Sequence, residues 1–238
     1  MIEIVLATRN AHKVAEVQRI VDSICSDITV LDLSAWPDAP EVVEDAPTFA
    51  GNALLKARAL AAHTGKPTMA DDSGICVDAL NGMPGIFSAR WSGTHGNDAQ
   101  NLQLLLDQMS DVPDSRRGAQ FTCAVALATP EGDERVVEGV VDGEIVRAPR
   151  GLDGFGYDPI FQPHGYVHTM AELTPDKKMQ SVIVVRRCAP WFRSWSMHWV
   201  VDLAAVKTVQ IAIARKRPSK NFCAGGGGRT LTSFDRGF

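Results

Sequence analysis

The stretch "IEIVLATRNAHKVAEVQRIVDSI", residues 2–24, joins a short apolar run to a longer segment with helical spacing. Ile2–Ala7 is rich in β-branched residues, which favours a strand buried on both faces. The second half places apolar side chains one helical turn apart, at Val14, Val17, Ile20, Val21 and Ile24. A buried strand that leads into an amphipathic helix is typical of an α/β fold.

The rest of the first 178 residues continues this alternation. The patterns predict strands at 27–33, 119–130 and 134–146, a strand, turn and strand over 67–80, and helices at 48–65 and 98–109. Thr48 can cap the 48–65 helix at its start, and Gly65 can end it. Residues 81–93 read as a loop, and 148–161 as a glycine-rich loop leading into a short strand. We therefore expect one α/β domain around a mixed sheet.

Composition places the chain among globular intracellular proteins. The 238 residues are 45% hydrophobic and 22% charged, and no apolar run approaches the length of a membrane helix. The first ten residues carry Glu3 inside their apolar run and lack a basic leader, so no signal peptide is expected. Five widely spaced cysteines without a Cys-x-x-Cys pair fit a reducing cytoplasm. We expect a cytoplasmic protein with no membrane partner.

The first candidate binding stretch is "TRNAHK", residues 8–13, between the first strand and its helix. Free N–H groups and the positive end of the dipole make such a helix start an anion site. Thr8 and Asn10 add neutral donors, while Arg9 and Lys13 add positive charge, a set that suits a polyphosphate. An ordinary capped helix with solvated basic residues explains the same pattern.

The second candidate is "ADDSG", residues 70–74. Asp71 and Asp72 can hold a hard cation through oxygen ligands, or one can act as general base toward a metal-bound water. An Asx-turn, in which Asp and Ser bond the backbone, is the alternative. The acidic "EVVED", residues 41–45, can contribute a further carboxylate or be a solvated loop.

The third candidate is "GFGYDP", residues 154–159. Its glycines allow close approach to a flat ligand, and Phe155 or Tyr157 can stack on a base. Asp158 can accept hydrogen bonds from the N–H groups of a base. A tight turn with buried aromatic side chains is equally compatible with these residues.

Taken together, these stretches resemble one family. The segments "ATRNAHKVAE", "TFAGNALLKA", "ADDSGICVDALNGMPGIFSARWSG", "PRGLDGFGYDPIF" and "TMAEL" occur in the order found in inosine triphosphate pyrophosphatases, the Ham1-like non-canonical purine NTP pyrophosphatases. The resemblance covers residues 1–178. It implies an elongated mixed β-sheet flanked by helices, with two lobes, a central nucleotide cleft and a homodimer. It also implies Mg²⁺-dependent hydrolysis of ITP, dITP and XTP to the monophosphate and pyrophosphate.

The same resemblance implies roles for individual residues. Asp72 would be the catalytic base, and Glu44, Asp72 and Asp71 would lie at the metal. The substrate would be bound by Thr8, Arg9, Asn10, Ala11, His12, Lys13, Lys56, Ser73, Phe155, Gly156, Tyr157, Asp158 and Lys178. These roles agree with the chemistry, because attack on a triphosphate needs cations that disperse its charge. Selection of a 6-oxo purine over adenine needs buried polar groups that the wrong base leaves unpaired.

The resemblance ends after Lys178, where the family continues with Asn-x-Ile-Ser-His-Arg-Gly and a closing helix. Residues 179–238 carry ten Lys/Arg against two Asp, whereas the whole chain has a net charge of −4. With compatible codons, reading from the third base of Lys178 gives Asn-Ala-Ile-Ser-His-Arg-Gly. We therefore interpret 1–178 as the catalytic domain and 179–238 as a poorly ordered tail derived from a single-base frameshift. Loss of the Ser-His-Arg motif would impair base selectivity and turnover.

Three other functions are compatible with the sequence. The chain could be an inactive nucleotide-binding remnant, which would bind ITP without releasing pyrophosphate. It could be a related pyrophosphatase that acts on other nucleotides. It could also bind nucleic acid through a basic tail in which Trp191, Trp195 and Trp199 share helical spacing, a reading that we rank below the frameshift.

Overall fold

The computed structural model describes residues 2–22 and 27–173, and its strands form one mixed sheet. The strand order is β2-β1-β3-β4-β5-β6. The two pairings of β1, with β2 and with β3, are parallel, and the remaining pairings are antiparallel. The strands are β1 (Ile2–Leu6), β2 (Ile28–Leu31), β3 (Thr68–Val77), β4 (Gly118–Ala128), β5 (Glu134–Ile145) and β6 (Phe161–Pro163). The predicted α/β class with a mixed sheet is confirmed.

Within the described residues, three α-helices flank this sheet: α1 (Ala11–Asp22), α2 (Phe49–Thr64) and α3 (Asp98–Gln108). Helix α2 begins and ends as predicted: the Thr48 side chain accepts a 3.0 Å bond from Gly51 N, and Gly65 adopts a left-handed φ of 66°. Both caps satisfy backbone groups that a helix end would otherwise leave unpaired. Small residues let α2 pack closely on the strands, with Ala53, Ala57 and Ala61 against Ala70, Ala124 and Ala126.

The predicted strand, turn and strand over 67–80 is wrong, because β3 is one continuous strand of ten residues. It pairs without interruption with β4, from Thr68 opposite Ala128 to Val77 opposite Ala119. Gly74 is not in a turn; its missing side chain allows the segment that contains Gly85 and Ser88 to approach β3 closely. A Cβ there would lie 2.4 Å from Ser88 Oγ and 2.5 Å from the Gly85 carbonyl oxygen of the short 3-10 segment η3 (Gly85–Arg90).

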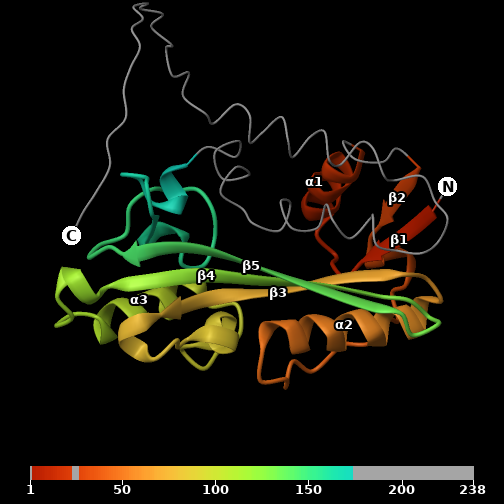
Figure 1. Cartoon of the computed structure of the whole chain (residues 1–238), viewed down its shortest axis with the longest axis horizontal. Coiled ribbons are helices and arrows are strands. Elements are labelled where there is room, and N and C mark those ends of the chain that lie inside the picture. The colour runs from red at the N-terminus through yellow and green to blue at the C-terminus, as the bar shows by residue number, and fades with distance from the viewer. Residues whose placement is uncertain (1, 23–26, 174–238) are drawn as a thin grey trace, which may run out of the picture.

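The described elements form an elongated body with two groups at opposite ends of the long strands (Figure 1). Helix α1 and the short strands β1 and β2 form one group, and residues 146–173 form the other. Helices α2 and α3 lie on the opposite face of the long strands. Each group has its own core, one around Ile4, Leu6 and Val30, the other around Leu105, Ile160 and Phe161. The expected elongated, two-lobed architecture is confirmed. No helix among the described residues is long and apolar enough to cross a bilayer.

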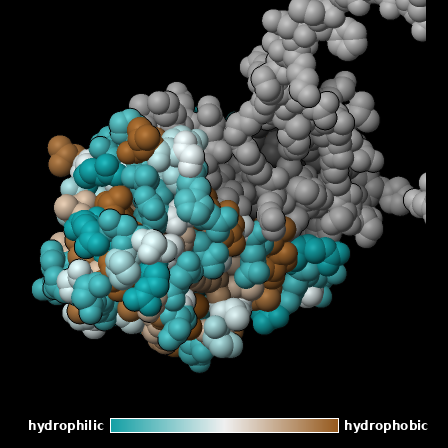
Figure 2. All heavy atoms as spheres, turned by 60° about the vertical axis from the view of Figure 1, so that its left-hand side comes forward, coloured by the Kyte–Doolittle hydropathy of each residue, from teal (hydrophilic) through white to brown (hydrophobic). Residues whose placement is uncertain are grey.

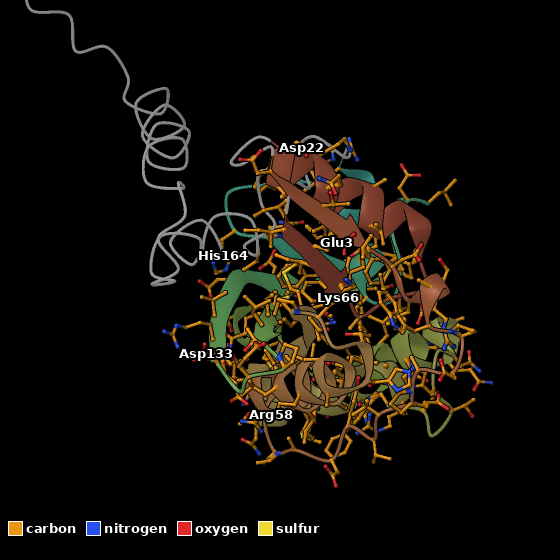
Figure 3. All side chains as sticks on the ribbon, turned by 90° about the vertical axis from the view of Figure 1, so that its right-hand side faces the viewer. Glu3, Asp22, Arg58, Lys66, Asp133 and His164 are labelled. Carbon is orange, nitrogen blue, oxygen red and sulfur yellow. The ribbon has the colours of Figure 1, made fainter. Side chains whose placement is uncertain are left out.

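The outer edge of β2 is covered by a side chain of α1. Gln18 Nε2 donates to the Ile28 carbonyl oxygen at 3.0 Å, and Gln18 Oε1 accepts from Val30 N at 2.7 Å. At the same end, Lys66 Nζ bonds Glu3 Oε2 at 2.6 Å and ties β1 to the segment that enters β3; Figure 3 labels both residues.

Candidate active site

Asp72 is held by two hydrogen bonds on the α2 side of β3. Asn52 Nδ2 donates to Asp72 Oδ2 at 2.9 Å, and the Ser73 backbone N–H donates to Asp72 Oδ1 at 2.9 Å. Asn52 is fully buried, and its side-chain oxygen accepts a 2.9 Å bond from Ala46 N. One asparagine of α2 therefore connects the 44–46 loop to this carboxylate.

A nearby ion pair also affects the Asp72 carboxylate electrostatically. Lys56, one helical turn beyond Asn52, bonds Glu44 Oε1 at 2.7 Å, and both side chains are largely buried. Burial raises the pKa of Asp72, the Asn52 hydrogen bond and the Lys56 charge oppose that shift, and the Glu44 charge adds to it. Glu44, Lys56 and Asp72, which the sequence placed in one site, are therefore close neighbours.

A pocket of about 510 Å³ opens beside this group. Its walls carry the cationic side chains of Arg9, Lys56 and Arg90, together with His95, Thr8 and the acidic Glu41 and Glu44. Arg90 Nη2 donates to the Glu44 carbonyl oxygen at 3.4 Å, and its guanidinium lies 5.1 Å from the Phe87 ring centre. A pocket lined by several cations suits a polyanionic ligand.

Residues 8–13 form a capped helix start that also meets the pocket. Thr8 Oγ1 accepts from Asn10 N at 3.1 Å, and Asn10 Oδ1 accepts from Lys13 N at 3.4 Å. The side-chain oxygens of Thr8 and Asn10 therefore accept the bonds that cap the helix start, while the Thr8 O–H and the Asn10 amide NH₂ are the groups predicted to donate to a ligand. Ala11 and His12 begin α1, but their side chains lie outside the described part of the chain.

The side chain of Asp71 does not lie beside that of Asp72. Successive side chains of a strand point to opposite faces, so Asp71 faces α1, where Lys13 Nζ bonds its Oδ1 at 2.5 Å. Among the described residues, no group of three or more His, Cys, Asp or Glu side chains is arranged to hold a metal ion. Glu44 and Asp72 alone still fit Mg²⁺, which is commonly held by one or two carboxylates together with substrate phosphates.

The "GFGYDP" loop presents one aromatic ring and buries the other. Phe155 is 81% exposed, whereas Tyr157 is 5% exposed and donates its hydroxyl to the Ser88 carbonyl oxygen at 2.9 Å. Burial, and then the Asp98 charge, raise the pKa of Tyr157 above its usual range. Asp158 is nearly buried and accepts from Phe155 N at 3.3 Å. The alternative of a tight turn with buried aromatic side chains therefore holds for Tyr157 only, and Phe155 is open for stacking.

The remaining predicted residues divide between exposed and undescribed positions. Ser73 is exposed on β3, next to Asp72. Lys178, the predicted tail 179–238 and the reading-frame hypothesis lie outside the described residues. Asn52, Arg90 and His95 also belong to the site, although no sequence motif predicted them there. Asn52 could have been found from its i, i+4 spacing to Lys56, but no local pattern marks His95.

Known proteins are similar to this chain in both fold and sequence. The Ham1 family model matches residues 4–189. A "dITP/XTP pyrophosphatase" of Streptomyces coelicolor is 55% identical over 178 residues, which cover 75% of this chain and 89% of the relative. The crystal structure of a nucleoside-triphosphatase / dITP/XTP pyrophosphatase from Mycobacterium abscessus matches with a TM-score of 0.67 and 53% identity, over 75% of this chain and 92% of that one. The Ham1 protein of Staphylococcus aureus matches with a TM-score of 0.69 and 34% identity, over 90% of this chain and all of that one.

Proposed function

The chain belongs to the Ham1 family, and on that premise we propose that it hydrolyses non-canonical purine nucleoside triphosphates, such as dITP and XTP, to the monophosphate and pyrophosphate. The main support for this proposal is the position of Asp72. Hydrogen bonds from Asn52 and Ser73 fix its carboxylate, which lies beside the Glu44–Lys56 ion pair and a pocket lined by cationic side chains. This combination provides a general base next to a site for phosphates.

In this proposal the phosphates occupy the pocket beside the start of α1. Arg9, Lys56 and Arg90 line this pocket from three different segments. The start of α1 adds the positive end of its helix dipole, which also favours a phosphate. Dispersing the triphosphate charge lowers the barrier to attack on phosphorus. Lys13 would exchange Asp71 for a phosphate oxygen, since it already lies at the helix start.

Asp72 accepts the proton of the attacking water in this mechanism. Its two hydrogen bonds fix the direction of the carboxylate. Mg²⁺, held by Glu44 and Asp72, would supply further positive charge at the phosphates. The leaving group is pyrophosphate, because cleavage at the α-phosphorus leaves the monophosphate as the second product.

The base is proposed to stack on Phe155, whose ring is open to solvent, with the nearly buried Asp158 accepting from its N–H groups. A carboxylate at this position can accept from the N1–H of a 6-oxo purine, whereas N1 of adenine carries no hydrogen and presents a lone pair to it. We also propose that the protein works in the cytoplasm as a homodimer, a state that light scattering coupled to size exclusion would measure.

The test is product analysis with a panel of nucleotides. Purified chain is incubated with dITP, XTP, GTP and ATP, with Mg²⁺ or with EDTA, and pyrophosphate and phosphate are measured separately. Pyrophosphate release that favours dITP and XTP and needs Mg²⁺ supports the proposal. Asp72→Asn should abolish it without changing the fold. Binding of dITP with no pyrophosphate release would identify the inactive remnant, and indifference to the base would identify a broader pyrophosphatase.

A further inference from the structure

The loop that carries Phe155 is tied to α3 by a carboxylate that no sequence pattern assigned. Gly156 N donates to Asp98 Oδ2 at 2.9 Å. Asp98 is the first residue of α3, and the preceding Asn97 caps this helix by accepting a bond from Gln100 N. Figure 1 shows α3 at the same end of the sheet as residues 146–173. The Asp98 bond thus joins two segments that are 58 residues apart in the sequence.

Fixed points surround Phe155 on both sides. Before it, Asp153 N donates to the Ala171 carbonyl oxygen at 3.3 Å. After it, Gly156 is bound by Asp98, and the buried Tyr157 hydroxyl bonds Ser88. The ring itself remains exposed, and Figure 2, which brings this end of the molecule forward, shows hydrophobic residues projecting from a largely hydrophilic surface. The backbone is therefore held while the ring is presented to a ligand.

Gly156 is the point at which this arrangement can loosen. Its φ is +56°, in the left-handed region, and glycine reaches both signs of φ with little cost. The peptide between Phe155 and Gly156 is held at both of its polar groups: its carbonyl oxygen accepts from Asp158 N at 3.1 Å, and its N–H donates to Asp98. Without Asp98, only the Asp158 bond would fix the orientation of this peptide next to the Phe155 ring. The Asp98 carboxylate supplies the stronger of the two restraints, because a charge-assisted hydrogen bond is stronger than a neutral one.

We propose that Asp98 is a positioning residue that orients Phe155 for the purine base, through its hydrogen bond to Gly156 N. This inference rests on the proposed function, since it assigns Phe155 to the base. The phosphate pocket is built from other segments, including Arg9 and Lys56. Asp98 therefore affects recognition of the base and leaves recognition of the phosphates unchanged.

The expected effect is on nucleotide affinity. Removing the acceptor with Asp98→Ala should raise the KM for dITP about tenfold, as expected for loss of a hydrogen bond to a charged group. The kcat should change less than about twofold, because Asp72 and the pocket keep their geometry. Asp98→Asn retains a side-chain oxygen that can accept from Gly156 N, so it should restore most of the affinity.

Asp107→Ala is the matched control. Asp107 lies near the other end of α3, where its Oδ1 accepts from Gln103 Nε2 at 2.8 Å. Like Asp98→Ala, this substitution removes one carboxylate from α3. Inhibition by inorganic triphosphate provides a ligand with phosphates and no base. The proposal expects its inhibition constant to be the same in wild type, Asp98→Ala and Asp107→Ala.

Two results would overturn the proposal: an Asp98→Ala KM for dITP equal to that of Asp107→Ala, or an equal loss of affinity for dITP and for inorganic triphosphate. If wild type releases no pyrophosphate, the proposed function fails, but calorimetric titration with dITP still decides the role of Asp98. Binding about tenfold weaker in Asp98→Ala than in Asp107→Ala would support it. Equal binding, or none in any variant, would reject it.

Discussion

Asp71 and Asp72 are adjacent in the chain, but their carboxylates serve opposite faces of β3: Asp71 bonds Lys13 of α1, and Asp72 bonds Asn52 of α2. Two neutralising substitutions should therefore differ sharply. Asp72→Asn removes the proposed base and should lower kcat about 10²-fold or more. Asp71→Asn breaks only a partly exposed ion pair, and should change kcat/KM less than about fivefold.

Steady-state kinetics with dITP would separate the two variants, with circular dichroism as the control for folding. Equal losses in both variants would show that Asp71 works with Asp72, as a shared metal site requires, and would contradict the separation of the two carboxylates.

Asn52 should matter for both stability and catalysis. Asn52→Ala leaves the half-buried Asp72 without its side-chain donor and the Ala46 N–H without its acceptor. Such unmet groups cost about 1–3 kcal/mol each. Urea unfolding should show this loss, and kcat should fall at a temperature at which the variant is still folded. A stable variant with normal kcat would mean that Asp72 needs no fixed orientation.

Gly74→Ala should destabilise the fold. The new Cβ would meet Ser88 Oγ at 2.4 Å and the Gly85 carbonyl oxygen at 2.5 Å, and a backbone carbonyl cannot easily move aside. Overpacking of this kind costs about 1–3 kcal/mol. Thermal unfolding would measure it, with the exposed neighbour Ser73→Ala as a control for stability alone. An unchanged melting temperature would show that η3 shifts freely away from β3.

The Arg58–Glu134 pair should give stability that depends on pH. The hydrogen bond from Arg58 lowers the pKa of Glu134 in the folded chain. Since the folded pKa lies below the unfolded one, the pair stabilises at pH values above the unfolded pKa of about 4.3. Its contribution is lost as pH falls through the lowered folded value.

Glu134→Gln should therefore unfold more easily than wild type at pH 7, by no more than about 1 kcal/mol for a partly exposed pair. The difference should vanish in strong acid. Denaturant unfolding across this pH range would measure it, with Glu131→Gln in the neighbouring turn as the comparison. A difference that persists at the lowest pH would mean that charge is not its origin.

The reading frame after Lys178 gives a prediction about DNA. Resequencing the source gene around this codon should find one base inserted or deleted relative to the frame that encodes Asn-Ala-Ile-Ser-His-Arg-Gly. A gene that encodes Asn-Ala-Ile-Ser-His-Arg-Gly in frame would place the shift in the reported sequence instead. A gene whose codons cannot encode this motif in the shifted frame would reject the hypothesis. A chain with the frame restored should show higher kcat/KM for dITP and stronger selection against GTP.

Local signals predicted the helices and the long strands β4 and β5, but they misread β3. Thr48 and Gly65 mark the ends of α2 because a cap needs only neighbouring residues. The Ser-Gly pair within β3 carries turn chemistry as well, but pairing with β4, which lies far along the chain, determines the structure there. Segment 81–93, predicted as a loop, contains η3 for a similar reason, since it packs against Gly74.

The same distinction holds within the site. Thr8–Lys13 and Asp72 stand in recognisable stretches, so sequence alone suggested them. Reading β3 as one strand would also have separated Asp71 from Asp72, since alternation is a local rule. Arg90 and His95 reach the pocket only because η3 and the following loop lie against the 39–44 segment. That proximity arises from tertiary packing, for which the sequence carries no periodic signal.

The Gln18 amide has a consequence for how copies of this protein can meet. It occupies the outward C=O of Ile28 and N–H of Val30, as a neighbouring strand would. The opposite edge of the described sheet is β6, which has three residues and ends in Pro163. Neither outer strand is a good template for adding a strand from a second chain. A homodimer of this fold would therefore not continue its sheet through β2, where the Gln18 amide already occupies the outward groups.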